Sequence, residues 1–146
     1  MGIHVSWVHA NGEFQMNVIE SAVDGIPLIV VEGDLDQSSK PAVLDALHNV
    51  FSGAYPPQHL LIDLTDCAFL DSGGLSILLT MIARLPAGGW LGIIGASAGP
   101  NRVLEYTGFL DHEKVRFFSS RNGAAASVAH ERKLLQTQED KQATQK

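Results

Sequence analysis

Short apolar runs typical of buried strands alternate along this chain with apolar stripes at helical spacing, and this alternation limits the fold more than any other feature. The strand-like runs lie at residues 26–35, 60–64, 90–95 and 115–118, and the helical stripes at 43–51 and 75–85. Residues 99–107 and 123–135 are also expected to be helices, the second with an alanine-rich start. Strands that alternate with helices form a mostly parallel sheet with right-handed helical crossovers. The 146 residues suit one core, so we expect a single α/β domain.

The region before residue 26 predicts a hairpin. Residues 14–20 partly alternate apolar and polar side chains, and the turn pair Asp24-Gly25 then leads into the strand at 26–35. The sheet is therefore expected to be mixed. We expect an N-terminal arm at 1–13, the domain at 14–135 and a polar, disordered tail at 136–146. An exposed edge strand at 14–20 could pair or stay single, which leaves the oligomeric state open.

Charge and hydropathy exclude two classes of partner. The net charge is −6, and no cluster of Lys and Arg offers a nucleic-acid surface. No run of about 18 apolar residues could span a membrane, and the opening residues lack the basic and apolar regions of a signal peptide. The single cysteine, Cys67, ends an apolar run and is expected to be a small buried hydrophobe. A cytoplasmic location follows as the expectation.

Loops that follow parallel strands meet at one edge of the sheet, where sites usually form. The turn Asp71-Ser72-Gly73-Gly74-Leu75 lies at that edge, leading into a helix. Asp71 or Ser72 can accept hydrogen bonds from the free N–H groups of the first helical turn, and the glycines let the backbone bend sharply. From the residues alone, a well-capped helix start and a functional site both stay open. The loops expected at this edge are residues 34–38, 65–71, 96–99 and 119–122.

Residues 61–75 (LIDLTDCAFLDSGGL) resemble the signature of the STAS domain family, typified by bacterial anti-sigma-factor antagonists. Residues 33–36 (GDLD) are similar to the family's motif before its first helix, and residues 100–109 (PNRVLEYTGF) to its third helix and following turn. The resemblance covers roughly residues 14–135. It implies a single STAS-like domain with a mixed, mostly parallel sheet, an N-terminal hairpin and about four helices.

The resemblance also implies a function. Such proteins bind an anti-sigma factor that is also an ATP-dependent serine kinase, and thereby free a sigma factor for transcription. Phosphorylation of a hydroxyl in the signature breaks that complex. The partner-binding residues carried over to this chain, with neighbours at the same edge, are Asp34, Asp36, Asp71, Ser72, Gly73, Gly74 and Ser76.

The chain departs from the family pattern at the phosphoacceptor. The residue after the Asp-Ser pair usually carries the hydroxyl, and here it is Gly73. Ser72, in the exposed turn, is the favoured substitute, and Ser76, about one helical turn later, is the second candidate. A protein without any phosphoswitch stays equally open.

Other functions have less support. An enzyme with Ser72 as nucleophile would need a base in reach, and the Gly-x-Ser-x-Gly elbow is missing. The histidines form no close metal pair, so we expect no catalytic residue, no metal and no cofactor. A phospho-aspartate receiver would need a lysine after the later strands, and none is present. A STAS module of a stress-signalling scaffold or nucleotide-responsive regulator, without a phosphoswitch, stays open as the alternative.

Overall fold

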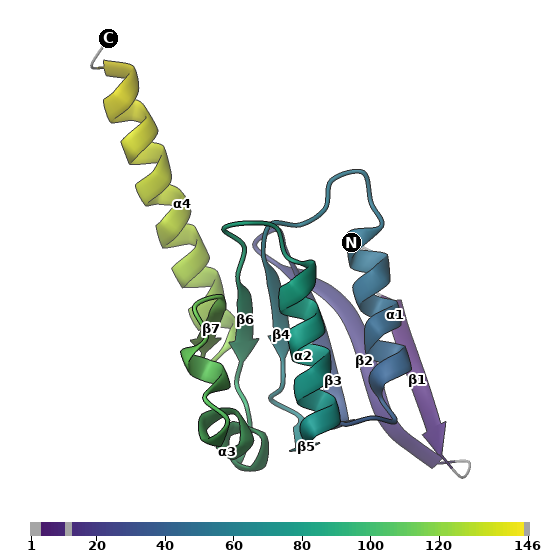
Figure 1. Ribbon diagram of the computed structural model, residues 1–146. Coiled ribbons are helices and arrows are strands. Elements are labelled where there is room, and N and C mark those ends of the chain that lie inside the picture. The colour runs from purple at the N-terminus through teal and green to yellow at the C-terminus, as the bar shows by residue number, and fades with distance from the viewer. Residues whose placement is uncertain (1–3, 11–12, 145–146) are drawn as a thin grey trace.

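The computed structural model describes the backbone of residues 4–10 and 13–144 and the side chains of residues 18–143. Strands and helices alternate within one sheet-containing domain (Figure 1). In chain order the elements are β1 (His4–Ala10), β2 (Glu13–Val23), β3 (Ile26–Leu35), α1 (Lys40–Phe51), β4 (Leu60–Asp63), β5 (Cys67–Leu70), α2 (Ser72–Arg84), β6 (Leu91–Ile94), α3 (Ala98–Tyr106), the short 3-10 helix η1 (Phe109–Asp111), β7 (Val115–Phe118) and α4 (Arg121–Thr144).

The sheet is mixed, as the sequence predicted. Its order is β1-β2-β3-β4-β6-β7, with the first two pairings antiparallel and the pairings from β3 to β7 parallel. β5 lies off this path and pairs in parallel with the end of β3. The expected α/β class with a hairpin, parallel strands and four α-helices is confirmed within the part of the chain that the structure describes.

Two short segments expected to be irregular are strands. Residues 4–10, predicted as an arm, form β1 and pair with β2, so β2 is an interior strand rather than the exposed edge. Pairing satisfies the N–H and C=O groups that β2 would otherwise leave free. Residues 67–70, predicted as loop, form β5, because Cys67 and Leu70 are buried and the end of β3 offers them a pairing edge.

The two faces of the sheet are covered unequally. Neighbouring residues of a strand point to opposite faces, so Ile29 and Val31 join the core beneath α1, α2 and α3. Leu28 and Val30 join a smaller cluster with residues of α4. Figure 1 shows α1 and α2 side by side across the sheet, with α4 standing apart from them. The larger core therefore lies behind the helix that follows the signature turn.

The last helix is longer than predicted. The sequence predicted an end near Leu135 and a disordered tail, whereas α4 continues to Thr144 and projects beyond the sheet (Figure 1). Its final turns are rich in Gln, Glu, Lys and Ala, which favour helix, and neither Gly nor Pro follows Gly123. Residues 132–143 are exposed, so local helix propensity rather than burial accounts for this extension.

Candidate functional site

The ends of β3 and β5 position the candidate site. Leu35 pairs with Leu70 in the last register of this parallel pair, so the chain leaves both strands at neighbouring points. One exit leads through residues 36–39 to α1, and the other leads through Asp71 to α2. Parallel pairing therefore brings together two segments that lie far apart in the sequence.

Asp71 is the cap of α2. Its backbone is extended, and its carboxylate Oδ1 accepts a hydrogen bond from the Gly74 N–H at 3.1 Å. The Asp71 carbonyl accepts the first helical bond, from the Leu75 N–H at 2.9 Å. Ser72 is thus the first residue of the helix, with an exposed side chain. Of the two capping residues left open by the sequence, the structure selects Asp71.

The two glycines allow the neighbouring loop to press against α2. A Cβ atom on Gly74 would collide with the carbonyl of Leu35, and one on Gly73 would stand 2.8 Å from the backbone nitrogen of Gln37. Both obstacles are backbone atoms, which cannot swing aside as a flexible side chain can. The glycines therefore provide close packing between α2 and the loop before α1, beyond the sharp bend that the sequence suggested.

Asp36 holds that loop closed. Its Oδ1 accepts hydrogen bonds from the N–H of Ser38 at 2.9 Å and from the hydroxyl of Ser38 at 2.6 Å. The Ser39 hydroxyl donates to the Asp36 carbonyl at 2.9 Å, and Ser39 is buried. Asp36 is thus a structural residue of the edge as well as a candidate contact, a role that the motif comparison did not indicate.

The remaining candidate residues lie near this edge with different exposures. Asp34 lies in β3 beside Phe69 of β5 and is partly buried. Ser76 lies in α2 and is also partly buried, and its carbonyl accepts a bond from the Thr80 hydroxyl at 2.9 Å. The exposed Ser72 is therefore easier to reach than Ser76.

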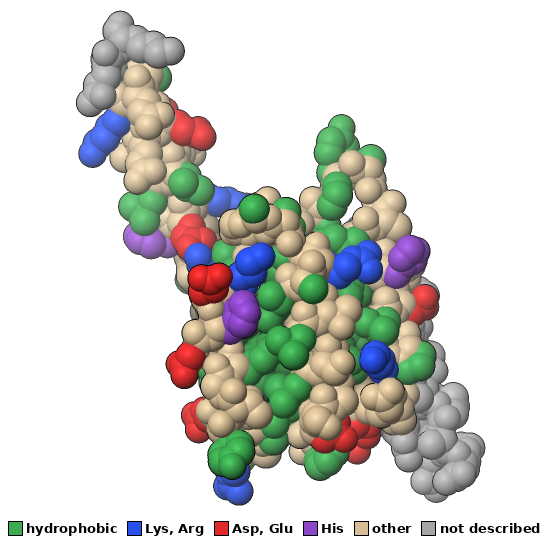
Figure 2. All heavy atoms as spheres, in the orientation of Figure 1, with side chains coloured by type: hydrophobic (Ala, Val, Ile, Leu, Met, Phe, Trp, Pro, Cys, Tyr) green, Lys and Arg blue, Asp and Glu red, His purple; other side chains and the backbone are tan. Residues whose placement is uncertain are grey.

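A half-exposed apolar groove adjoins the same helix. It lies between α2 and the segment around η1, and Leu75, Leu79 and Phe109 line it together with Gly108 and His112. The side chain of Leu79 is 51% exposed. Figure 2 shows hydrophobic side chains gathered on this face between α2 and α3. Leu79 belongs to the apolar stripe predicted at 75–85, but the structure leaves its side chain exposed rather than in the core.

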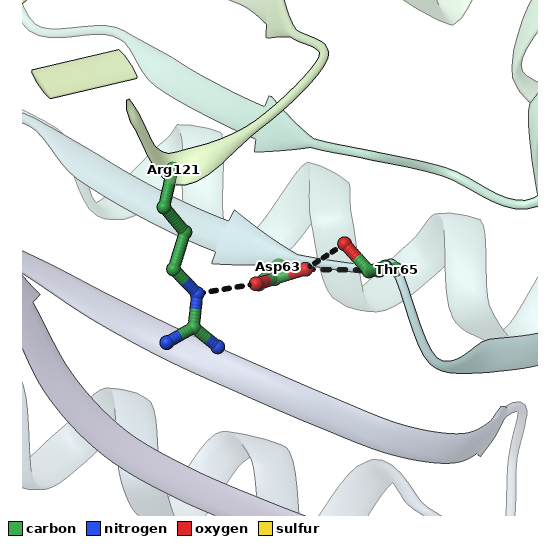
Figure 3. A network of polar contacts seen from close by, with 3 residues as sticks. All are labelled: Asp63, Thr65 and Arg121. Carbon is green, nitrogen blue, oxygen red and sulfur yellow. Dashed lines mark hydrogen bonds and ion pairs between the residues drawn. The ribbon is translucent and has the colours of Figure 1, made fainter. Parts of the chain in front are cut away.

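Asp63, also at the carboxyl edge, is buried and therefore not available to a partner. Asp63, the last residue of β4, accepts hydrogen bonds from the Thr65 N–H and hydroxyl at 2.9 and 2.6 Å. Its other oxygen accepts a bond from Arg121 Nε at 2.7 Å (Figure 3). Burial raises the pKa of Asp63, but the Thr65 hydrogen bonds and the Arg121 guanidinium outweigh it and hold the pKa below its ordinary value. This network ties the start of α4 to the sheet.

The opposite edge of the parallel strands carries an aromatic cluster. The ring of Trp90 stacks on His59 with centroids 4.3 Å apart, and the Arg116 guanidinium lies 4.7 Å from the Trp90 ring centroid. Arg116 also forms an ion pair with Glu131 of α4. Burial, and then the charge of Arg116, lower the pKa of His59. The backbone N–H of Trp90 donates to His59 Nδ1 at 3.1 Å, so the folded structure favours the neutral imidazole.

The described residues offer little for other chemistry. Residues 4–10 and 13–144 contain no group of three or more His, Cys, Asp or Glu side chains placed to hold a metal ion. Among the helices that the structure describes, none is both long and apolar enough to cross a membrane. Cys67 is buried, as expected, and burial raises the pKa of its thiol.

Proteins of known structure share this architecture. An anti-sigma factor antagonist from Mycobacterium paratuberculosis is 26% identical, with a TM-score of 0.61 over 69% of this chain and 85% of that protein. A putative anti-sigma factor antagonist from Thermotoga maritima has a TM-score of 0.63 at 16% identity, over 75% of this chain and 92% of the other. The antagonist SpoIIAA, in its unphosphorylated form, has a TM-score of 0.61 at 16% identity, over 77% and 96%. The two likenesses at 16% identity show the fold alone.

The family itself is shown by sequence. No curated protein sequence matches the chain significantly. The model of the STAS domain, however, matches residues 17–124, from β2 into the first turn of α4. That range contains both strands that form the candidate edge, the capped turn at Asp71 and the groove beside α2. The chain belongs to the STAS domain family.

Proposed function

We propose that this protein is an anti-sigma-factor antagonist. It binds an anti-sigma factor that is also an ATP-dependent serine kinase, and it thereby frees a sigma factor for transcription in the cytoplasm. The observation that carries the proposal is the exposed first turn of α2, held by Asp71 and packed against the Asp36 loop, in a chain whose structural relatives are anti-sigma factor antagonists. The chain itself has no catalytic role in this proposal.

The proposed docking surface combines polar and apolar parts. Its polar part comprises Asp34, Asp36, Asp71, Ser72, Gly73 and Ser76 at the edge of the sheet, and Gly74, also expected from the sequence to contact the partner, is buried beneath them. Its apolar part is the groove along α2, where Leu75 and Leu79 are partly exposed. A centre of apolar contacts with a polar rim is the usual composition of a specific protein interface.

Phosphorylation of Ser72 is the proposed switch. A phosphoserine carries a charge of about −1.5 to −2 at neutral pH. At Ser72 that charge would stand next to the Asp71 carboxylate, which already caps the helix. Added like charge and bulk at this point of the docking surface would release the partner. Ser76 is the less accessible second candidate.

One observation favours a second candidate function. Gly73 stands at the family's usual acceptor position and has no hydroxyl. A STAS interaction module that binds a scaffold or responds to a nucleotide, without a phosphoswitch, is consistent with that substitution. The two functions differ in the partner recovered from the native cell and in the response to charge at Ser72.

A pull-down from native cell extract, followed by binding measurements with the purified partner, tests the proposal. Recovery of a kinase-type anti-sigma factor is expected, and Ser72→Asp should weaken its binding while Ser72→Ala should not. Ser52→Asp, at the exposed far end of α1, is the matched charge control. Reproducible recovery of unrelated scaffold proteins alone, or equal binding by Ser72→Asp and Ser52→Asp, would contradict the proposal.

A further inference from the structure

Position 73, where the family usually carries the phosphoacceptor hydroxyl, has no room for a side chain as well as no hydroxyl. A Cβ atom on Gly73 would lie 2.8 Å from the Gln37 nitrogen and 3.2 Å from the Gln37 Cα. These backbone atoms belong to the loop of residues 36–39. That loop therefore occupies the space in which a side chain at position 73 would stand.

The same loop supplies an exposed hydroxyl. Ser38 follows Gln37 directly, its side chain is exposed, and its hydroxyl donates to Asp36 Oδ1 at 2.6 Å. The next serine, Ser39, is 1% exposed, and its hydroxyl donates to the carbonyl of Asp36. Of these two serines, a kinase could reach Ser38 without unfolding the loop.

We propose that Ser38 is a phosphorylation site, modified by the kinase partner at the edge that the partner contacts. This inference rests on the proposed function, because it takes the anti-sigma factor to be a serine kinase. It adds to Ser72 a second acceptor, which lies in the loop packed against the signature turn rather than in the turn itself.

The transfer balances with ATP as the donor. The Ser38 oxygen forms a bond to the γ-phosphorus as the bond from that phosphorus to the β–γ bridging oxygen breaks, and ADP leaves. The hydroxyl proton passes to Asp36 Oδ1, which already accepts it in a hydrogen bond, and then to water. Asp36 therefore orients the Ser38 hydroxyl and is the proton acceptor of the transfer that the kinase catalyses.

The phosphate would change the loop that supports the docking surface. The Asp36 carboxylate accepts bonds from the N–H groups of Ser38 and Ser39 and from the Ser38 hydroxyl, and a phosphate on Ser38 removes the last of these and repels the carboxylate. Lys40, in a first helical turn without acidic residues, is the neighbouring positive charge. Because the loop packs against Gly73, rearrangement of the loop alters the turn at Ser72.

Phosphopeptide mapping tests the site directly. The full chain and its Ser38→Ala, Ser72→Ala and double variants are incubated with the purified kinase-type anti-sigma factor and ATP, and mass spectrometry locates the phosphate. We expect phosphate on Ser38 in the wild type and in Ser72→Ala, and none at that position in Ser38→Ala. Asp36→Asn should slow modification of Ser38 by about a hundredfold, the lower end of the usual contribution of a positioned proton acceptor. Phosphorylation of Ser72 in the Asp36→Asn variant serves as the control that the kinase still binds.

The outcomes separate this inference from the proposed function. Binding of the anti-sigma factor without phosphate on Ser38, including phosphate on Ser72 alone, overturns the Ser38 site and leaves the antagonist function standing. Failure of the wild-type protein to bind any kinase-type anti-sigma factor overturns both. Phosphate on Ser38 at an unchanged rate in Asp36→Asn would overturn the role of Asp36 as proton acceptor while supporting the site.

Discussion

The two edges of the parallel strands are built in contrasting ways. At the carboxyl edge, Ser38 in the loop before α1 and Ser72 at the start of α2 have exposed side chains, and the two segments pack closely through Gly73 and Gly74. At the amino edge, Trp90 is 5% exposed and its ring contacts His59 and Arg116. The first edge leaves polar groups accessible to a partner, whereas the second buries the indole ring of Trp90. Substitutions should therefore separate binding from stability according to the edge they change.

Trp90→Ala should give the largest loss of stability. It removes a nearly buried ring that contacts His59, Phe118 and Arg116, and truncation of a buried Trp typically costs about 3–5 kcal/mol. Urea unfolding followed by circular dichroism measures the change. Trp90→Phe, which keeps an aromatic ring, should lose clearly less. A partner affinity that falls in Trp90→Ala while the protein is fully folded would break the contrast between the edges.

Gly74→Ala should affect both stability and binding. Its Cβ would collide with the carbonyl of Leu35, and such overpacking typically costs about 1–3 kcal/mol. The shift would also move the turn at Ser72 away from the Gln37 loop. Thermal unfolding and affinity for the partner are measured together. Gly53→Ala is the control, because nothing lies within 4 Å of its added Cβ; equal behaviour of the two variants would contradict the close packing at Gly74.

Asp63→Asn should cost about 1.5–3 kcal/mol, the range for hydrogen bonds to charged groups. The folded pKa of Asp63 lies below its ordinary value of about 4. Its contribution is therefore present above that ordinary value and is lost as pH falls through the lower folded pKa. Unfolding measured from pH 7 down to pH 2 should show a smaller acid loss in Asp63→Asn than in the wild type. Asp66→Asn, at an exposed position, is the control. If Asp63→Asn and the wild type lost the same free energy of unfolding between pH 7 and pH 2, the result would argue against the Asp63–Arg121 pair.

His59→Gln should have the smallest effect on stability, and this effect should appear in the pH dependence of the free energy of unfolding. The folded pKa of His59 is lowered, so the unfolded chain binds more protons between the folded value and about 6.5. Stability should accordingly rise with pH through that window and level off above it. His59→Gln should flatten this rise, whereas His48→Gln on the exposed side of α1 should keep it. A wild-type stability that falls as pH increases through the window would contradict the direction.

The candidate edge was predictable in outline because its signals are local. The apolar run 60–64 and the turn at Asp71 place a strand end beside a helix start, and loops after parallel strands share one edge. The cap at Asp71 also follows from one short segment. In contrast, β1 and β5 were missed because their strand character depends on the pairing edges of β2 and β3.

The close contacts of the edge could not be read from local pattern. The approach of Gln37 to Gly73 joins loops that follow different strands, and the Asp63–Arg121 pair joins residues 58 positions apart. A single sequence shows that Gly73 lacks a hydroxyl but not that its space is filled. It likewise shows that Ser38 is polar but not that its hydroxyl is exposed and bonded to Asp36.

The sequence by itself determined the alternation of strands and helices, the mixed sheet and the turn at residues 71–75, because periodicity and turn residues act over a few positions. The tertiary structure decided which acids are exposed and which are paired. It assigned Asp63 to Arg121, Asp36 to the closed loop and Asp71 to the cap of α2. The physical reason is that burial and ion pairing depend on neighbours that the fold, rather than the chain order, brings within a few ångströms.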